Sequence, residues 1–308
     1  MCGIVGFLDK TGDQQAPVGQ VLLSMLSALG RRGPDSAGVA LYGDAGDGPL
    51  VLRVKLGAHD GVKQQAAEVC DRVSALAPVR DAARCGEYLR LVVDYAGELA
   101  ALERAIEAVG DGLEVVSMGK RLEVVKQVGS PENLEAEYAI SSFTGTHGLG
   151  HTRMSTESRV DLSHSQPFWA HGRPDLAVVH NGHITNYHKL RRRYEQRGHR
   201  FHTENDSEII SVYLADQMAR GASFTGALES SLRDFDGSFS YLAASADSLG
   251  FVKDAFAFKP LVVTETPSYV AIATEEIALQ MAFGADLRVW EPGVKQLRTW
   301  SVAERSAS

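Results

Sequence analysis

The chain begins with a short apolar strand, CGIVGFL, whose first residue is Cys2, directly after the initiator Met1. Residues 18–29 then place apolar side chains at the spacing of one helix face, which predicts a helix that ends at Gly30. The following segment, AGVALYG, predicts a second strand. This strand–helix–strand opening favours a mixed α and β fold in which Cys2 stands at the start of the first strand.

The composition is that of an acidic globular protein. The 308 residues are enough for one large domain or two smaller ones with hydrophobic cores. The formal net charge of −8 argues against binding to nucleic acid or to an anionic membrane surface, because both need clustered basic side chains. The densest basic run, residues 191–193, lies in a helix-like segment and is interpreted as a solvated helix face.

The three cysteines, Cys2, Cys70 and Cys85, form no CxxC pair and are odd in number. This pattern is typical of a reducing cytoplasm rather than of a disulfide framework. The first apolar stretch is too short for a signal peptide, and no apolar run approaches the roughly 20 residues that a membrane span needs. We therefore expect a soluble cytoplasmic protein without a membrane segment.

The middle of the chain differs in pattern from its two ends. Residues 50–134 alternate strand-like and helix-like segments but contain none of the motifs described below. We therefore expect an inserted α+β subdomain over residues 46–142 and one discontinuous domain over residues 1–45 and 143–292. Residues 293–308 are expected to form a C-terminal tail.

Cys2 is the first candidate for chemistry. Removal of the initiator methionine, which a small second side chain permits, places the thiol beside its own free α-amino group. An unperturbed α-amine has a pKa of about 7.7–8.0, so part of it is neutral at pH 7 and can accept the thiol proton. One residue then supplies nucleophile and general base, and Gly3 leaves room for close backbone approach. The alternative is that Cys2 is only the first residue of a buried strand.

Five motifs occur along the chain in a fixed order. They are MCGIVGF at the start, RRGPDSAG at 31–38, GHTRMST at 150–156, VVHNGHITNY at 178–187 and TENDSEII at 203–210. Together they resemble the motif set of class II glutamine amidotransferases, a family of N-terminal nucleophile hydrolases. The resemblance covers the chain except for the insertion and the tail. It implies an α+β fold, a four-layer α-β-β-α sandwich that here carries an inserted α+β subdomain.

The resemblance also implies roles for individual residues. Arg153 matches the arginine that grips the α-carboxylate of glutamine, a task that suits a planar guanidinium. Asp206 matches the aspartate that receives the α-ammonium group. Asn181 and Gly182 match the oxyanion hole, whose donors face the charge that develops on the tetrahedral intermediate.

Further residues are implied in supporting positions. Arg32 matches a residue that lies near the nucleophile in relatives. The residues expected to line the substrate pocket are Ser155, Thr156 and His164. Two positions depart from the family, because Met154 replaces an aromatic residue of several relatives and Glu157 replaces a histidine of some. Both departures are expected to affect substrate binding rather than the nucleophile or the oxyanion donors.

Nine of the ten histidines fall between His147 and His202, some of them three or four residues apart. Such pairs can bind zinc, but no cysteine stands at ligand spacing and His180 belongs to the oxyanion motif. We therefore predict no metal site. The glycines of GTHGLG precede no GK[ST] and do not fit GxGxxG, so no phosphate loop is predicted either.

The resemblance further implies that the ammonia is consumed by another polypeptide. Larger relatives fuse this domain to a synthase, whereas a further domain of about 150 residues has no room here. The segments RMSTES and SQPF look most similar to the glutamate synthase branch, which implies a subunit of a glutamate synthase or N-methylglutamate synthase complex. We expect no cofactor on this chain, and FMN and an iron–sulfur cluster on the partner subunit.

Two other functions remain open. One is an N-terminal nucleophile hydrolase that acts on a different amide, which would leave Arg153 and Asp206 without the charged groups of an amino acid. The other is a non-catalytic regulatory subunit that retains the fold. Its mark would be a missing nucleophile or oxyanion residue, and none is missing. Comparing glutamine with simple acyl amides as substrates separates the first alternative from the main hypothesis.

Overall fold

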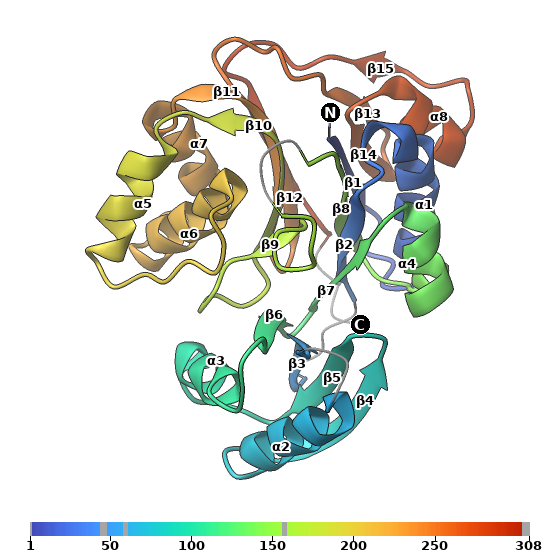
Figure 1. The fold of residues 1–308 in the computed structure, drawn as a ribbon. Coiled ribbons are helices and arrows are strands. Elements are labelled where there is room, and N and C mark those ends of the chain that lie inside the picture. Colours follow the sequence, from blue (N-terminus) through green and yellow to red (C-terminus); the bar gives the residue numbers. More distant parts are fainter. Residues whose placement is uncertain (1, 44–47, 58–60, 156–158, 304–308) are drawn as a thin grey trace.

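Two β-sheets stacked face to face form the centre of the protein (Figure 1). The structure is a computed structural model, and it describes residues 2–43, 48–57, 61–155 and 159–303. Helices cover the outer face of each large sheet, and a third, smaller sheet lies below them in the view. This arrangement is the four-layer α-β-β-α sandwich that the motifs implied.

The first sheet contains the N-terminal strand at its centre. Its seven strands, in order across the sheet, are β15 (Val289–Trp290), β13 (Val262–Glu265), β14 (Tyr269–Ala273), β1 (Gly3–Asp9), β8 (His147–Arg153), β2 (Ser36–Tyr42) and β7 (Leu122–Val128). All neighbouring strands are antiparallel. Because β1 pairs with both β8 and β14, the backbone that follows Cys2 is fixed on two sides.

The second sheet faces β1 and carries most of the VVHNGHITNY motif. Its five strands, in order, are β16 (Leu297–Ser301), β12 (Ser248–Lys253), β11 (Gly237–Ala244), β10 (Ala177–Ile184) and β9 (Phe168–Trp169). β1 lies in contact with β10, β11 and β12 across the interface between the sheets. The predicted VVHNGH segment is therefore a strand that crosses close to the N-terminal strand.

Three helices cover each large sheet. Those on the first sheet are α1 (Val18–Ala28), α4 (Pro131–Tyr138) and α8 (Glu276–Phe283). Those on the second sheet are α5 (Tyr187–Glu195), α6 (Asp206–Ala219) and α7 (Phe224–Asp234). Two single turns of 3-10 helix, η1 (Gly30–Arg32) and η2 (Ile140–Ser142), flank α1 and α4. α1 confirms the helix predicted over residues 18–29 to within one residue at its end.

Glycines in β8 allow α1 to pack closely on the sheet. A Cβ atom at Gly148 would lie 2.7 Å from Leu22 Cδ1, and one at Gly150 would lie 2.9 Å from Leu26 Cδ1. Both distances are shorter than real Cβ contacts, so a larger residue would force these leucine side chains to shift in the close-packed core. The GTHGLG segment therefore serves helix–sheet packing.

The smaller third sheet is formed by residues between β2 and β7. Its strands, in order, are β4 (Val79–Cys85), β5 (Tyr88–Val93), β3 (Leu50–Lys55) and β6 (Glu114–Gly119), with helices α2 (Val62–Ser74) and α3 (Leu99–Glu107). The alternation of strand-like and helix-like segments predicted over residues 50–134 agrees with this order of elements, except that the sequence pattern does not indicate β4. Five of its seven residues are exposed, so this edge strand lacks the apolar alternation that identifies a half-buried strand.

Pairing in the large sheets differs from the expected segment boundaries. β7 and α4 lie within residues 46–142, yet β7 pairs with β2 along its whole length and α4 packs against α1. The expected tail, residues 293–308, contains β16, which pairs with β12 as an edge strand of the second sheet. These segments belong to the sandwich because of partners that lie far away in the sequence, which residue patterns alone do not identify.

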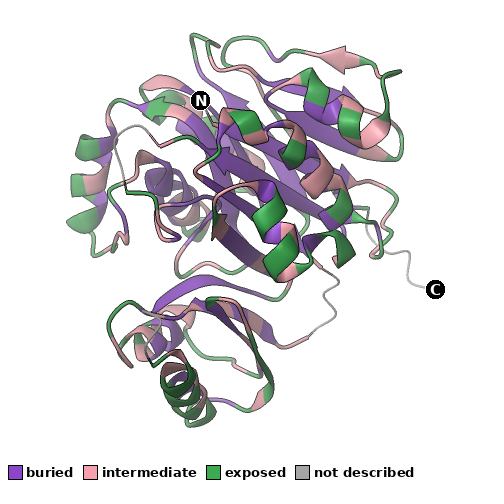
Figure 2. Cartoon of the chain, turned by 45° about the vertical axis from the view of Figure 1, so that its right-hand side comes forward, coloured by how far each residue is buried: buried purple, intermediate pink, exposed green. Residues whose placement is uncertain are grey.

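Burial follows the layers of the sandwich. In Figure 2 the central strands are buried, whereas the outer faces of the helices are exposed. One apolar cluster fills the space between the large sheets and beneath α1 and α8, and a second lies beneath α5, α6 and α7. None of the helices in the described ranges has the length and apolar character needed to cross a bilayer.

Candidate active site

A cavity of about 980 Å³ lies beside Cys2. The predicted site residues in its wall are Cys2, Arg153, Ser155, His164, Gly182 and Asp206. They come from the start of β1, the end of β8, the loop that follows β8, β10 and the first turn of α6. Thr156, the remaining residue predicted to line the substrate pocket, lies outside the described residues.

Cys2 is held where β1 begins by contacts from two other segments. Its Sγ lies 3.9 Å from the carbonyl oxygen of Met154, and Arg32 Nε donates a hydrogen bond to the Cys2 carbonyl oxygen at 3.4 Å. Arg32 also forms an ion pair with Glu275, at the start of α8. Arg32 does not line the cavity, and the structure places it beside the backbone of Cys2.

Close contacts at two predicted positions require glycine. A Cβ atom at Gly3 would lie 2.7 Å from Thr152 Oγ1 on the neighbouring strand. Gly182 has a φ of 138°, a conformation that L side chains rarely adopt, and a Cβ there would lie 2.3 Å from the carbonyl oxygen of Ser238. Both glycines let strands approach closely next to the cavity.

Asn181 supplies a buried hydrogen-bond donor next to Gly182. The residue is only 4% exposed, and its Nδ2 has no hydrogen-bond partner among the described residues. Strand alternation places Asn181 on the face of β10 that holds Ala177 and Val179, towards the sheet that contains β1. A buried donor without a partner costs about 1–3 kcal/mol, so this amide is prepared for an acceptor.

Arg153 lies at the end of β8 and is 4% exposed. Its Nη1 donates to the carbonyl oxygen of Arg159 at 2.8 Å, and its Nη2 lies 3.5 Å from Ser155 Oγ. Burial lowers the pKa of Arg153 from its ordinary value, and the charge of Cys2 acts in the opposite direction. The guanidinium group is thus a desolvated cation in the wall of the cavity.

Asp35, within the RGPDS motif, fixes the segment that follows Arg153. Its Oδ2 accepts a hydrogen bond from the backbone of Ser155 at 2.6 Å, and its own N–H donates to the carbonyl oxygen of Arg153 at 3.0 Å. Sequence reasoning did not assign a role to Asp35, although the motif that contains it was recognised. The structure shows that this motif braces the cavity wall.

Asp206 is the first residue of α6, where the helix dipole favours a negative charge. Its Oδ2 accepts a hydrogen bond from the Ile184 N–H at 2.8 Å, which joins the end of β10 to the start of α6. His183 Nδ1 lies 3.5 Å from the same oxygen. The side chain is 15% exposed, so the carboxylate is held rigidly while one side still faces the cavity.

His164 is oriented by a neighbouring carboxylate. Its Nδ1 lies 2.7 Å from Asp161 Oδ1, which also accepts the backbone N–H of His164 at 2.9 Å. Burial raises the pKa of Asp161, but the hydrogen bonds from His164 outweigh it and the net shift is downward. Asp161 therefore stays ionised and fixes the ring at the edge of the cavity.

A side-chain clamp that sequence reasoning missed holds β10 in place. Gln166 Oε1 accepts from the His180 N–H at 2.6 Å, and Gln166 Nε2 donates to the His180 carbonyl oxygen at 3.2 Å. The His180 ring in turn lies 2.8 Å from Ser207 Oγ, on α6. Because Asn181 and Gly182 follow His180, these hydrogen bonds fix the part of β10 that carries both residues. Gln166 belongs to the SQPF segment, and the resemblance of that segment to the family was the sequence signal that could have indicated its role.

Comparisons with known proteins identify the family of this chain. The sequence profile of the glutamine amidotransferase domain matches residues 151–281. A Methanothermobacter thermautotrophicus protein, provisionally named a glutamine amidotransferase, is 37% identical over 286 residues, which cover 91% of this chain and 93% of its own. The glutamine amidotransferase-like protein GlxB of Rhizobium meliloti is 35% identical over 301 residues, which cover 97% of this chain and 98% of its own. The chain belongs to the class II glutamine amidotransferase family.

A solved structure shares the fold of this amidotransferase. The allosteric regulatory enzyme of purine biosynthesis superimposes with a TM-score of 0.63 at 16% sequence identity. The superposition covers 97% of this chain and 47% of that structure, so the amidotransferase spans about half of that longer chain. This likeness supports the N-terminal nucleophile hydrolase fold.

One of the two departures from the family pattern lies on the cavity wall. Met154 lines the cavity, is 40% exposed, and offers its carbonyl oxygen to the Cys2 thiol. Its backbone thus contacts the Cys2 thiol, and the residue forms part of the cavity wall. Glu157, the second departure, lies outside the described residues.

Two buried histidines of β8 should make the stability of this amidotransferase depend on pH. Burial lowers the pKa of His147 to about 4 and that of His151 to about 3, whereas unfolded histidine titrates near 6.5. Below pH 6.5 the unfolded chain binds protons that the folded protein does not. The free energy of unfolding should therefore be highest above pH 6.5 and fall below it, by up to about 1.4 kcal/mol per pH unit for each histidine. Urea unfolding near pH 7 and near pH 5 should show this loss, and equal free energies at both would contradict it.

Proposed function

We propose that this amidotransferase hydrolyses L-glutamine to glutamate and ammonia through a thioester on Cys2, and supplies the ammonia to a separate synthase subunit. The observation that carries the proposal is the single cavity that brings together Cys2, Arg153, Gly182 and Asp206. These residues offer a nucleophile, a cation, a backbone donor and an anion. That set matches the chemical groups of free glutamine.

In the first step, Cys2 Sγ attacks the side-chain carbonyl carbon of glutamine while the thiol proton passes to the free α-amine of Cys2. Asn181 Nδ2 and the Gly182 N–H stabilise the oxyanion of the tetrahedral intermediate. The protonated α-amine of Cys2 then returns this proton to the leaving nitrogen, the C–N bond breaks, and ammonia departs. A γ-glutamyl thioester remains on Cys2.

In the second step, a water molecule attacks the thioester carbonyl carbon while the α-amine takes one of its protons. The C–S bond breaks, and the proton passes to the thiolate. Glutamate is released and Cys2 is regenerated. The same oxyanion donors serve both steps, because a negative oxygen develops at the same carbon each time.

The charged ends of glutamine are recognised by two fixed residues. In this proposal Arg153 binds the α-carboxylate and Asp206 binds the α-ammonium group. Ser155 and His164, which line the same cavity, complete the pocket. Arg32 and Gly3 position the nucleophile from outside the cavity. The desolvated state of Arg153 supports its role, because a buried cation gains most from an anionic ligand.

Replacement of Asp206 by asparagine should weaken glutamine binding. The amide keeps the size of the side chain and can still accept the Ile184 N–H, but it lacks the charge that pairs with the α-ammonium group. We expect KM for glutamine to rise about 10- to 100-fold, the scale of a lost charged hydrogen bond. Steady-state kinetics of the variant measure this change.

Two comparisons make the Asp206 result specific. Asp13→Asn, at an exposed position away from the cavity, should leave KM unchanged. A simple acyl amide without an amino-acid headgroup should be hydrolysed equally by wild type and Asp206→Asn. If the variant loses activity on both substrates alike, Asp206 does not recognise the headgroup, and a different amide becomes the better candidate substrate.

The proposed acceptor is a synthase subunit of the glutamate synthase or N-methylglutamate synthase type. Its support is the similarity of the RMSTES and SQPF segments to that branch of the family. In such a complex FMN and an iron–sulfur cluster belong to the partner, and this chain contributes only the glutaminase step. Co-purification from the native host, followed by mass spectrometry, identifies the partner. A partner without a flavin would contradict this assignment while leaving the glutaminase step intact.

Covalent labelling tests the thioester. A glutamine analogue with an electrophilic side chain should add once, at Cys2, to a protein that has lost Met1. Intact-mass measurement and peptide mapping locate the adduct. Cys70 and Cys85 provide the internal comparison, since both thiols are also partly exposed. An adduct at either of them and none at Cys2 would overturn the assignment of the nucleophile.

A further inference from the structure

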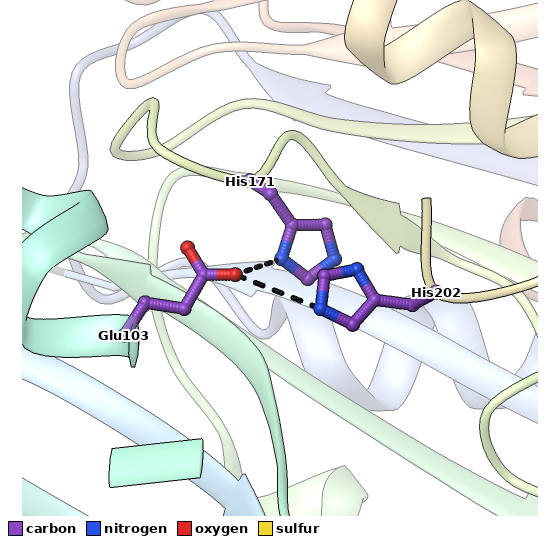
Figure 3. Close-up of side chains that lie close together, drawn as sticks. All are labelled: Glu103, His171 and His202. Atoms are coloured by element: carbon purple, nitrogen blue, oxygen red, sulfur yellow. Dashed lines mark hydrogen bonds and ion pairs between the residues drawn. The ribbon is translucent and has the colours of Figure 1, made fainter. Parts of the chain in front are cut away.

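Three side chains from distant segments meet where the third sheet contacts the sandwich (Figure 3). Glu103 lies on α3, His171 lies in the turn after β9, and His202 lies in the loop before α6. Each offers one ligand atom, and these atoms all lie within 4.8 Å of one another. Among the described residues, Glu103, His171 and His202 form the one group of three or more histidine, cysteine or carboxylate side chains whose ligand atoms lie this close together.

The donor atoms are spaced as a small metal ion requires. Glu103 Oε1 lies 2.6 Å from His171 Nδ1 and 3.8 Å from His202 Nε2. Glu107, one helical turn after Glu103, brings its Oε1 to 3.3 Å from the same His202 nitrogen. Four ligands at about 2.0–2.1 Å around a tetrahedral ion stand roughly 3.4 Å apart, so small side-chain movements complete the set.

The His202 ring lacks well-formed hydrogen bonds. Its two nitrogens are buried and close to carboxylates, but neither has the geometry of a hydrogen bond to a described residue. The ring stacks on His171 with centroids 3.9 Å apart and an angle of 14° between the planes. Parallel imidazoles that present nitrogens to the same carboxylate suit shared coordination of a cation better than two separate ion pairs.

Glu208 holds the other side of the His202 ring. This carboxylate is fully buried, accepts hydrogen bonds from Thr203, and has its Oε1 3.7 Å from His202 Nδ1. A carboxylate behind a histidine fixes the ring and makes its far nitrogen a better ligand, as in many metal sites. The outer support of a metal site is therefore present.

We propose that Glu103, His171 and His202 bind a divalent transition-metal ion of the zinc class, with Glu107 as the fourth ligand. Imidazole and carboxylate donors in a tetrahedral set favour zinc over magnesium or calcium, which prefer oxygen ligands alone. The spacing of the histidines along the chain predicted no metal, because the ligands are separated by 68 and 31 positions (103 to 171, and 171 to 202).

The bound ion would link the third sheet to the glutamine pocket. His202 also lines the large cavity and precedes Asp206 by four positions, whereas Glu103 and Glu107 belong to α3. A metal that joins these elements fixes the loop that carries the aspartate of the pocket. Its role is structural, and it stands on this geometry whether or not glutamine is the substrate.

Zinc binding tests this site directly. The protein is treated with a chelator, dialysed, and titrated with Zn²⁺ in competition with a chromophoric chelator, and bound metal is measured by mass spectrometry. The same titration on Cys2→Ala excludes binding by that thiol. We expect one equivalent of zinc per chain in both proteins, together with a higher melting temperature. Absence of a stoichiometric site in Cys2→Ala would overturn the proposal.

Ligand variants locate the ion. Glu103→Gln keeps the size of the side chain, and His171→Asn removes the imidazole but leaves a polar side chain. Each variant should weaken zinc binding by more than the 10- to 100-fold typical of an outer-shell change. Both should also lose the rise in melting temperature. His188→Asn, an exposed histidine on α5, is the matched control and should bind as wild type. Wild-type affinity in both ligand variants, with melting curves that show they are folded, would place the metal elsewhere.

Discussion

Cys2→Ala should abolish glutamine hydrolysis while the protein still binds glutamine. Removing a nucleophile lowers kcat by about 10⁴–10⁶-fold in hydrolases where this has been measured. Alanine is also small enough to permit removal of Met1, so the free α-amine is kept and only the thiol is lost. The headgroup contacts of Arg153 and Asp206 remain, and the dissociation constant for glutamine should change little. Ammonia release and calorimetric titration measure the two quantities.

Matched variants show whether the loss is specific to this thiol. Cys70→Ala and Cys85→Ala remove the other two cysteines, neither of which lines the large cavity, and should retain wild-type activity. Cys2→Ser keeps an oxygen nucleophile of much higher pKa and should retain only a trace of activity. Substantial hydrolysis by Cys2→Ala would exclude the thioester mechanism.

Asn181→Ala should lower kcat about 10²–10³-fold with little change in KM, the cost of one oxyanion-hole donor. The reason is the buried Nδ2 of this residue, which has no partner among the described residues and is offered to charge that appears only in the transition state. Stopped assays of ammonia release over a range of glutamine concentrations separate kcat from KM.

Asn181→Asp sharpens this test because it keeps the shape of the side chain. It replaces the donor by a carboxylate that repels the oxyanion, so its kcat should fall at least as far as that of the alanine variant. Asn133→Ala, at an exposed position in α4, removes an amide that donates a hydrogen bond to the Val128 carbonyl oxygen, and it should leave kcat and KM unchanged. If Asn181→Ala instead raised KM by the same factor and left kcat unchanged, the amide would be assigned to substrate binding.

The cavity is assembled by strands that lie far apart in the chain. β1 and β8 bring Cys2 and Arg153 to one side, and the clamp of Gln166 on His180 fixes the strand that carries Asn181 on the other. Asp206 closes the set from the first turn of α6 through its bond to Ile184. Small displacements of any of these elements would separate the donors from the nucleophile, which explains why the site needs a rigid two-sheet core.

The sequence by itself predicted the candidate chemistry. Cys2, Arg153, Asn181, Gly182 and Asp206 were predicted as site residues because they stand in short ordered motifs that resemble those of class II glutamine amidotransferases. The four-layer fold was predicted from the same motifs. Helices such as α1 were predicted because the spacing of their apolar residues is visible within a dozen consecutive positions of the sequence.

Only the tertiary structure decided which distant segments meet. β7 pairs with β2 in the first sheet, and β16 pairs with β12 in the second. The residue pattern of a strand does not identify the strand with which it pairs. The clamp of Gln166 on His180 and the meeting of Glu103 with His202 likewise depend on packing between elements. Hydrogen bonds and metal coordination act over a few ångströms in space, whereas the sequence gives only the separation of residues along the chain. Residues far apart in the sequence come within that distance only when the chain has folded.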